Sequence, residues 1–399
     1  MPAAAPGNTL DPAQQALVDL VAGRPAAVRD WQAVILLARR NRVAAFLGSR
    51  IGQLSPSPPA EIARTLAMHH LATRAANRRL MAGLAAIGRQ LAGLGLVAVP
   101  VKGASLILRL YPDPGQRSMS DLDLWVAGPD AGRARHALVA SGLALDFPGD
   151  PPLSRFHHQM DLRLGCLEGR RPAWGHLPPL LLVDSDVKVE IHPSFDWHPR
   201  LLPPALTAAI WSRIQATPGW PGVAFLAPED ELRLLLAHLL YHAADGGLPL
   251  LLYLDLALAW GAPSWRSGGE DVDDPEARGA LALAVAALGD PATAGGLGPA
   301  WPWRRLCLES CAAVGSSPSG AGEDGRWLVE RWRMLGQVPG WGNRLRYLAG
   351  WLVPSPAFMR ASLTADTPAR LVAAYWRRLA GIVGRGLRGL LPSRGAGSR

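Results

Sequence analysis

Residues 118–126 read SMSDLDLWV, a segment that is polar at its start and then alternates between acidic and apolar side chains. This alternation predicts a β-strand, in which successive side chains point to opposite faces. Asp121 and Asp123 would then share one face, while Leu122 and Leu124 face the core. Two adjacent carboxylates repel each other, and a cation between them relieves the repulsion. The segment therefore predicts a strand that carries a candidate Mg²⁺ or Mn²⁺ site.

A second acidic strand follows at residues 187–192, which read VKVEIH. Strict alternation places Lys188, Glu190 and His192 on one face. Glu190 supplies a third carboxylate, as two-metal phosphoryl chemistry requires. His192 is either a metal-adjacent or base residue or an ordinary histidine at a strand end. Lys188 either contacts a phosphate or pairs with Glu190 or Asp186.

Upstream of both strands, residues 96–101 read LVAVPV and predict a short buried strand. It ends in Lys102, one of only two lysines among 41 basic residues. Gly103 permits close backbone approach, and the helix expected after it offers free N–H groups to a phosphate. Ser105 adds a hydroxyl. The junction is therefore a candidate phosphate-binding loop.

Together these segments resemble the uncharacterised nucleotidyltransferase family of the polymerase-β-like superfamily. The family pattern is K-G, then Y-P-x-x-x-x-R, then D-x-D, and residues 101–123 carry it in that order. Residues 189–192 resemble its second strand signature. A helical signature further on is similar to residues 229–256, which include His238, His242 and Asp255. The resemblance covers about residues 71–258.

The resemblance implies a Mg²⁺-dependent transfer of an NMP group from an NTP, with Asp121, Asp123 and Glu190 as metal ligands. It also implies that Gly103 and Ser105 face the triphosphate, although Ala104 stands where the superfamily has Gly or Ser. The acceptor would be a peptide, protein, sugar or small metabolite rather than RNA. The alternatives are a nucleotide- or partner-binding protein without turnover, and a toxin-like transferase that acts on tRNA.

Arg117 lies four residues before the first acidic residue of the motif. Its guanidinium either binds a phosphate bidentately or pairs with Asp113 or Asp121. His238 and His242 stand one helical turn apart, and with Asp255 they either line the far wall of a nucleotide cleft or serve helix packing. Leu239 follows His238, so the zinc-protease motif H-E-x-x-H is absent.

The expected fold class is α+β, with a small mixed-sheet core between two helical regions. The N-terminal helical region is expected at residues 1–94, the mixed-sheet core at residues 95–202 and the C-terminal helical region at residues 203–399. Helices are expected at residues 31–47, 61–94, 104–111 and 131–141. The chain is expected to be helical again after about residue 203, with a helix start at residues 227–231. Further strands are expected at residues 160–164 and 183–191, and residues 264–274 read as a polar loop.

Composition limits the protein class. Hydrophobic residues make up 49% of the chain, no run of eighteen apolar residues occurs, and residues 1–10 lack the pattern of a secretory signal. A cytoplasmic location is therefore expected. Cys166, Cys307 and Cys311 form neither a disulfide framework nor a zinc site. Residues 371–391 are arginine-rich and amphipathic, suited to an anionic surface or to packing on the domain.

Overall fold

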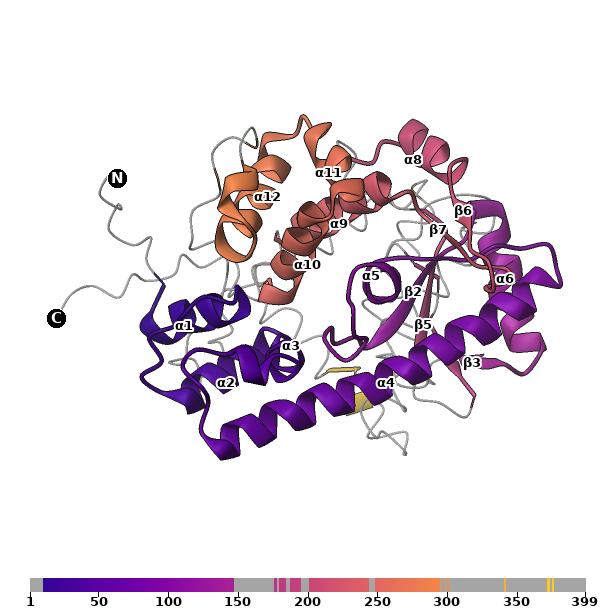
Figure 1. Ribbon diagram of the computed structural model, residues 1–399. Coiled ribbons are helices and arrows are strands. Elements are labelled where there is room, and N and C mark those ends of the chain that lie inside the picture. Colours follow the sequence, from indigo (N-terminus) through magenta and orange to yellow (C-terminus); the bar gives the residue numbers. More distant parts are fainter. Residues whose placement is uncertain are drawn as a thin grey trace.

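The computed structural model in Figure 1 describes residues 10–146, 176–177, 179–183, 187–194, 201–243 and 248–294, with a few single positions beyond them. The strand expected at residues 160–164, the three cysteines and most of the arginine-rich segment 371–391 lie outside these residues. Among the helices that are described, none is both long and apolar enough to cross a membrane.

The N-terminal helices are α1 (Pro12–Val21), α2 (Trp31–Arg40), α3 (Ala44–Gly48) and the 3₁₀ turn η1 (Ile51–Gln53). The helix predicted from residue 31 to residue 47 is in fact interrupted between α2 and α3. Asn41 ends α2 by donating from Nδ2 to the carbonyl of Leu37 at 3.0 Å, and Arg42 has a φ of 60°. A left-handed residue cannot continue a right-handed helix, so the chain turns here.

The long helix α4 (Ala60–Ala92) confirms the helix predicted over residues 61–94. Its apolar stripe is buried, with Leu66, Leu84, Ile87 and Leu91 almost inaccessible to solvent. Its N-terminal half packs on α3, and its C-terminal half packs on the sheet (Figure 1). One straight element thus connects the N-terminal helices to the strands that carry the acidic residues.

The central sheet contains β1 (Val99–Pro100), β2 (Asp121–Trp125), β3 (Ala144–Asp146), β4 (Leu180–Leu182) and β5 (Lys188–His192), in the order β1-β2-β5-β4-β3. β2 and β5 are parallel, and the other described pairs are antiparallel. The expected α+β class with a mixed sheet is therefore confirmed. The strand predicted over residues 183–191 is wrong at its start, because Val183 follows β4 at a turn and β5 begins only at Lys188.

Two helices connect the strands of the sheet. Helix α5 (Gly103–Arg109) follows β1, and α6 (Gly128–Ala140) follows β2. One face of the sheet is apolar, with Leu122, Leu124 and Val189 fully buried in a core shared with α4 and α6. The opposite face carries the polar side chains of β2 and β5.

The chain after residue 200 is mainly helical. It contains α8 (Pro204–Trp211), the small hairpin of β6 (Gln215–Ala216) and β7 (Ala224–Phe225), and then α9 (Pro228–Ala243), α10 (Leu250–Gly261), α11 (Pro263–Glu270), α12 (Pro275–Leu288) and the turn η3 (Pro291–Ala294). A large apolar core joins these helices to α1, α2 and α3. The N-terminal and C-terminal helices therefore pack on each other beside the sheet (Figure 1).

The polar loop predicted over residues 264–274 is wrong, because α11 occupies most of it. Its glycines permit close helix packing rather than a turn. A Cβ on Gly268 would lie 2.0 Å from the carbonyl oxygen of Glu229 in α9. The polar, glycine-bearing composition therefore reflects contact between α11 and α9.

Candidate functional site

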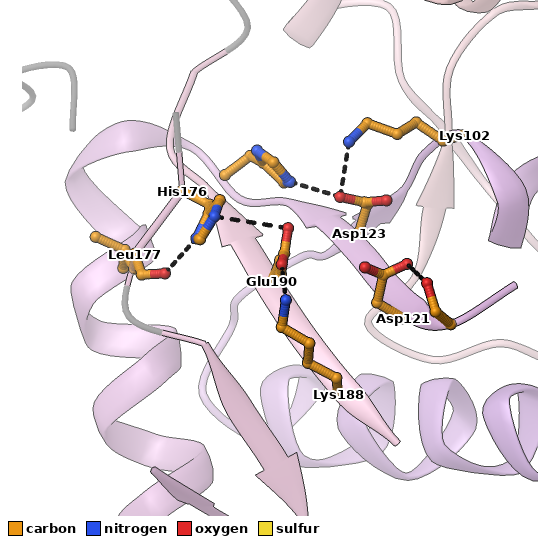
Figure 2. Close-up of polar contacts among 9 residues, drawn as sticks. Lys102, Asp121, Asp123, His176, Leu177, Lys188 and Glu190 are labelled. Carbon is orange, nitrogen blue, oxygen red and sulfur yellow. Dashed lines mark hydrogen bonds and ion pairs between the residues drawn. The ribbon is translucent and has the colours of Figure 1, made fainter. Parts of the chain in front are cut away.

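The polar face of the sheet is set by the pairing of β2 with β5. The two strands run parallel, with Asp121 opposite Lys188 and Asp123 opposite Glu190. Because side chains alternate along each strand, these four project to the side away from the apolar core. Figure 2 shows the carboxylates of Asp121, Asp123 and Glu190 gathered on this one face.

Asp123 is the most enclosed of the three acids. Its Oδ1 lies 2.8 Å from Nζ of Lys102 and 2.8 Å from Nε2 of His192. Burial opposes ionisation of Asp123, but the charge of Lys102 and the hydrogen bond from His192 hold its pKa well below the usual range. The carboxylate is thus anionic and already surrounded by donors.

Glu190 has its own set of partners. Nζ of Lys188 donates to Oε1, and Nε2 of His176 lies 3.7 Å from Oε2 (Figure 2). The rings of His176 and His192 meet edge to face with centroids 5.6 Å apart. Burial again opposes ionisation, but His176 and Lys188 help to lower the pKa of Glu190. Lys188 therefore pairs with Glu190, one of the two options considered from sequence.

Asp121 differs from the other two acids because no cation pairs with it among the described residues. Ser120 Oγ donates to its Oδ1 at 3.2 Å. Burial, followed by the charges of Asp123 and Glu190, raises the pKa of Asp121 to about 6. This rise is the effect expected where carboxylates crowd together, and a cation near them would reverse it.

The donor set at this face fits a divalent metal ion. Asp123, Glu190 and His192 each offer one ligand atom, and these atoms lie within 4.8 Å of one another. The tightest group therefore contains His192 in place of the expected Asp121. Asp121 lies beside that group and lines the same cavity.

A cavity of about 330 Å³ opens in front of the three carboxylates. Its lining comes from three separated parts of the chain, which are the α2–α3 turn, the sheet region and the C-terminal helices. The lining residues are Arg42, Lys102, Gly103, Arg117, Met119, Ser120, Asp121, Asp123, Glu190, His238, Pro249 and Leu252. The lining combines cations and acids with the apolar surface of Met119, Pro249 and Leu252.

The candidate phosphate loop is only partly as expected. Lys102 has a φ of 53°, a conformation that costs energy for a residue with a side chain. Gly103 lines the cavity, and a Cβ there would lie 2.3 Å from Nη1 of Arg117 and 2.5 Å from Sδ of Met119. The close approach at Gly103 is thus to the side chains of Arg117 and Met119, and its predicted contact with a phosphate stays a prediction.

Ser105 does not lie where the resemblance placed it. Its side chain is fully buried and donates to Oε2 of Glu231 at 2.6 Å, away from the cavity lining. The expected triphosphate contact of Ser105 is therefore corrected to a contact with α9. Ser105 lies two residues after Gly103 in α5. Because a helix turns by about 100° per residue, the two residues face different directions.

Arg117 lines the cavity, but its acidic partner is neither Asp113 nor Asp121. Its Nε and Nη2 donate to the two carboxylate oxygens of Asp255 at 2.9 and 2.7 Å, and Tyr111 Oη donates to the same carboxylate at 2.7 Å. Burial disfavours the charge on Arg117, but Asp255 raises the pKa above its usual value. Asp255 therefore holds Arg117 from α10 instead of lining the cavity itself.

From the sequence, five of the lining residues were not assigned to the site, and the role of His238 was left open; the five are Arg42, Met119, Ser120, Pro249 and Leu252. The only local sequence signal for Arg42 is the Asn41-Arg42 pair, which lies where the predicted helix is interrupted. His238 lines the cavity, which is the first of the two roles suggested for it, the other being helix packing. The side chain of His242 lies outside the described part of the structure.

A family model described as "Uncharacterised nucleotidyltransferase" matches residues 27–284, about two thirds of the chain. No curated protein and no solved structure gives a significant match. The matched region contains every residue that lines the cavity.

Proposed function

Since the chain belongs to the uncharacterised nucleotidyltransferase family, we propose that it transfers an NMP group from an NTP to an acceptor hydroxyl or phosphate in a Mg²⁺-dependent reaction. One observation carries the proposal. The carboxylates of Asp121, Asp123 and Glu190, from two adjacent parallel strands, line a single cavity together with cationic side chains.

The metal assignment rests on the chemistry of these donors. Carboxylate oxygens suit both Mg²⁺ and Mn²⁺. We assign Asp121, Asp123 and Glu190 as the residues that would hold the metal. When bound, divalent ions here would neutralise phosphate charge and lower the pKa of the attacking acceptor.

The protein's own cations would act on the phosphates. In the transfer, an acceptor oxygen forms a bond to the α-phosphorus, the bond from that phosphorus to the bridging oxygen breaks, and pyrophosphate leaves. Lys102 and Arg117 line the same cavity as the acids, so both can balance charge that develops on the leaving group. Lys188 instead orients Glu190 through their hydrogen bond.

A label-transfer assay tests the proposal. Each NTP, labelled either at the α- or at the γ-phosphorus, is incubated with protein, Mg²⁺ and cell extract. Transfer of the α-label alone, with pyrophosphate release, is expected for the wild type and is lost in Asp121→Asn and Glu190→Gln. Asp130→Asn, at the start of α6, is the matched control and retains transfer.

The same assay classifies the acceptor and separates the alternatives. Labelled product that resists ribonuclease but not protease would identify a peptide or protein acceptor, and the reverse would identify RNA. Transfer of the γ-label would indicate a kinase-like reaction instead. Metal-dependent NTP binding without any transfer would support a binding protein without turnover.

A further inference from the structure

Arg42 occupies a strained position on the cavity wall. It stands between α2 and α3 and lines the cavity with Arg117 and the three carboxylates. Its φ of 60° places a residue with a long side chain in the left-handed region. The N–H of Val43 donates to the carbonyl of Ala38 at 2.9 Å, so Arg42 is the left-handed residue that ends α2, a position where glycine is usual and a longer side chain costs energy.

The contacts on both sides of Arg42 fix this conformation. The preceding Asn41 accepts from the N–H groups of two residues at the start of α10, Leu250 at 3.1 Å on its side chain and Leu251 at 3.2 Å on its carbonyl. Ser118 Oγ donates to the carbonyl of Arg42 at 3.1 Å, and Arg42 Nη2 donates back to the carbonyl of Ser118 at 3.3 Å. The turn is thus tied both to α10 and to the segment that precedes Asp121.

The cations of the cavity are not equally neutralised. Lys102 pairs with Asp123, and Arg117 pairs with Asp255. No carboxylate of the described residues lies within ion-pair distance of the Arg42 guanidinium. Desolvation and the charge of Arg117 lower the pKa of Arg42, whereas the charges of Asp121, Asp255 and Asp123 raise it, and none of these carboxylates pairs with Arg42 as a direct counter-charge. A bound anion would supply that charge.

We infer that Arg42 is a substrate-binding residue whose guanidinium contacts the terminal phosphates of the NTP, which form the leaving pyrophosphate. The inference rests on the proposed function for the identity of the anion. Its structural basis is separate, namely a preorganised cation that faces the cavity. The N-terminal helices would therefore contribute directly to nucleotide binding. Arginine suits this role because its fork can bind two phosphate oxygens at once.

Calorimetry with inorganic tripolyphosphate, with and without Mg²⁺, tests the anion site without any nucleotide. Arg42→Ala is expected to weaken tripolyphosphate and NTP binding by about tenfold or more, since a charge-assisted contact is lost. Binding of the corresponding NMP is expected to change little. Arg39→Ala, in the last turn of α2 and outside the cavity lining, is the control and is expected to bind like the wild type.

A second variant separates binding from folding. Arg42→Gly removes the side chain but relieves the strain of a positive φ, so its unfolding midpoint is expected to equal or exceed that of the wild type. Weak tripolyphosphate binding by this stable variant would support the inference. Unchanged binding in both Arg42 variants, or equal loss for NMP and NTP, would overturn it.

The outcomes also distinguish this inference from the proposed function. If tripolyphosphate binds through Arg42 and competes with NTP, both stand. If it binds through Arg42 but does not compete with NTP, Arg42 serves a different anion, such as a phosphorylated acceptor, and the inference fails. If NTP and tripolyphosphate both bind through Arg42 but no label is transferred, the proposed function fails and the inference stands. If no NTP is bound, both fail.

Discussion

Asp123 and Glu190 are register partners on adjacent parallel strands, β2 and β5. Each of these acids already has a lysine partner, Lys102 for Asp123 and Lys188 for Glu190. The lysines hold the acids in their charged form but also compete with any metal ion for the same oxygens. Replacing the acid and replacing its lysine partner are therefore expected to change metal affinity in opposite directions.

Glu190→Gln is expected to weaken Mn²⁺ binding by about ten- to a hundredfold, whereas Lys188→Met is expected to strengthen it, because a competing cation is removed. Electron paramagnetic resonance titration with Mn²⁺ measures both. Asp130→Asn serves as the control. If Lys188→Met leaves Mn²⁺ affinity unchanged and abolishes NTP binding, Lys188 contacts the nucleotide and is not chiefly the partner of Glu190.

Asp255→Ala is expected to lower the free energy of unfolding by about 3–5 kcal/mol, because Arg117 would remain buried and charged without its partner. A triple variant, Arg117→Met, Tyr111→Phe and Asp255→Leu, removes every member of the cluster and is expected to regain much of that loss. The variants are compared by their urea unfolding midpoints, provided that the free energy of unfolding depends on urea concentration equally in each. A triple variant less stable than Asp255→Ala would mean that the cluster contributes more than the avoidance of a lone charge.

Glu231 predicts a specific pH dependence of stability. Burial, which outweighs the nearby Arg109, raises its pKa from 4.5 to about 7. The folded protein then binds a proton more tightly than the unfolded chain, so this residue's contribution to stability is complete below the unfolded pKa. It is lost as the pH rises through the folded pKa, by roughly 3 kcal/mol in total.

Glu231→Gln is therefore expected to flatten the fall in stability across this pH range, because glutamine does not ionise. Urea unfolding at several pH values between about 4.5 and about 8 measures the slope. Glu229→Gln, in the same turn of α9 but only half-buried, is the matched control. An unchanged slope in Glu231→Gln would show that Glu231 is already ionised in the folded protein.

Gly88→Ala is expected to destabilise the fold by about 1–3 kcal/mol, although alanine normally favours a helix. A Cβ on Gly88 of α4 would lie 2.6 Å from both the carbonyl oxygen of Pro221 and Cγ2 of Val223. Thermal unfolding measures the change. Gly93→Ala is the control, because its nearest contact would be an ordinary 3.6 Å. A rise in midpoint for Gly88→Ala would contradict the close packing of α4 against this loop.

Local periodicity predicted the strands that carry the acids and the helix α4. Alternation over residues 121–125 and 188–192 placed the carboxylates on one face, and the apolar stripe of α4 defined its buried side. These features depend only on neighbours a few positions apart. The same reasoning failed for α11, where glycines serve helix contact, and for the short strand β4, which contains too few residues for a period.

The remainder of the site depends on contacts that no local pattern encodes. Arg117 and Asp255 are 138 positions apart, and Ser105 and Glu231 are 126 apart. Arg42 reaches the cavity because a residue of positive φ turns the chain between two helices. Sequence spacing could list such residues as candidates but could not choose their partners, because the choice is made by tertiary packing.

The cavity walls also bear on how this family could evolve. Arg42 precedes the sheet, and Leu252 follows it by many residues, yet both border the same space. A gene fragment that encodes only the acidic strands would inherit Asp121, Asp123 and Glu190 without two of the surfaces that line the cavity. Recombination that exchanged the sheet alone would separate the acids from Arg42 and from Asp255. We therefore expect residues 27–284 to be inherited as one block, and the lining of the cavity to diverge by substitution within that block rather than by exchange of modules.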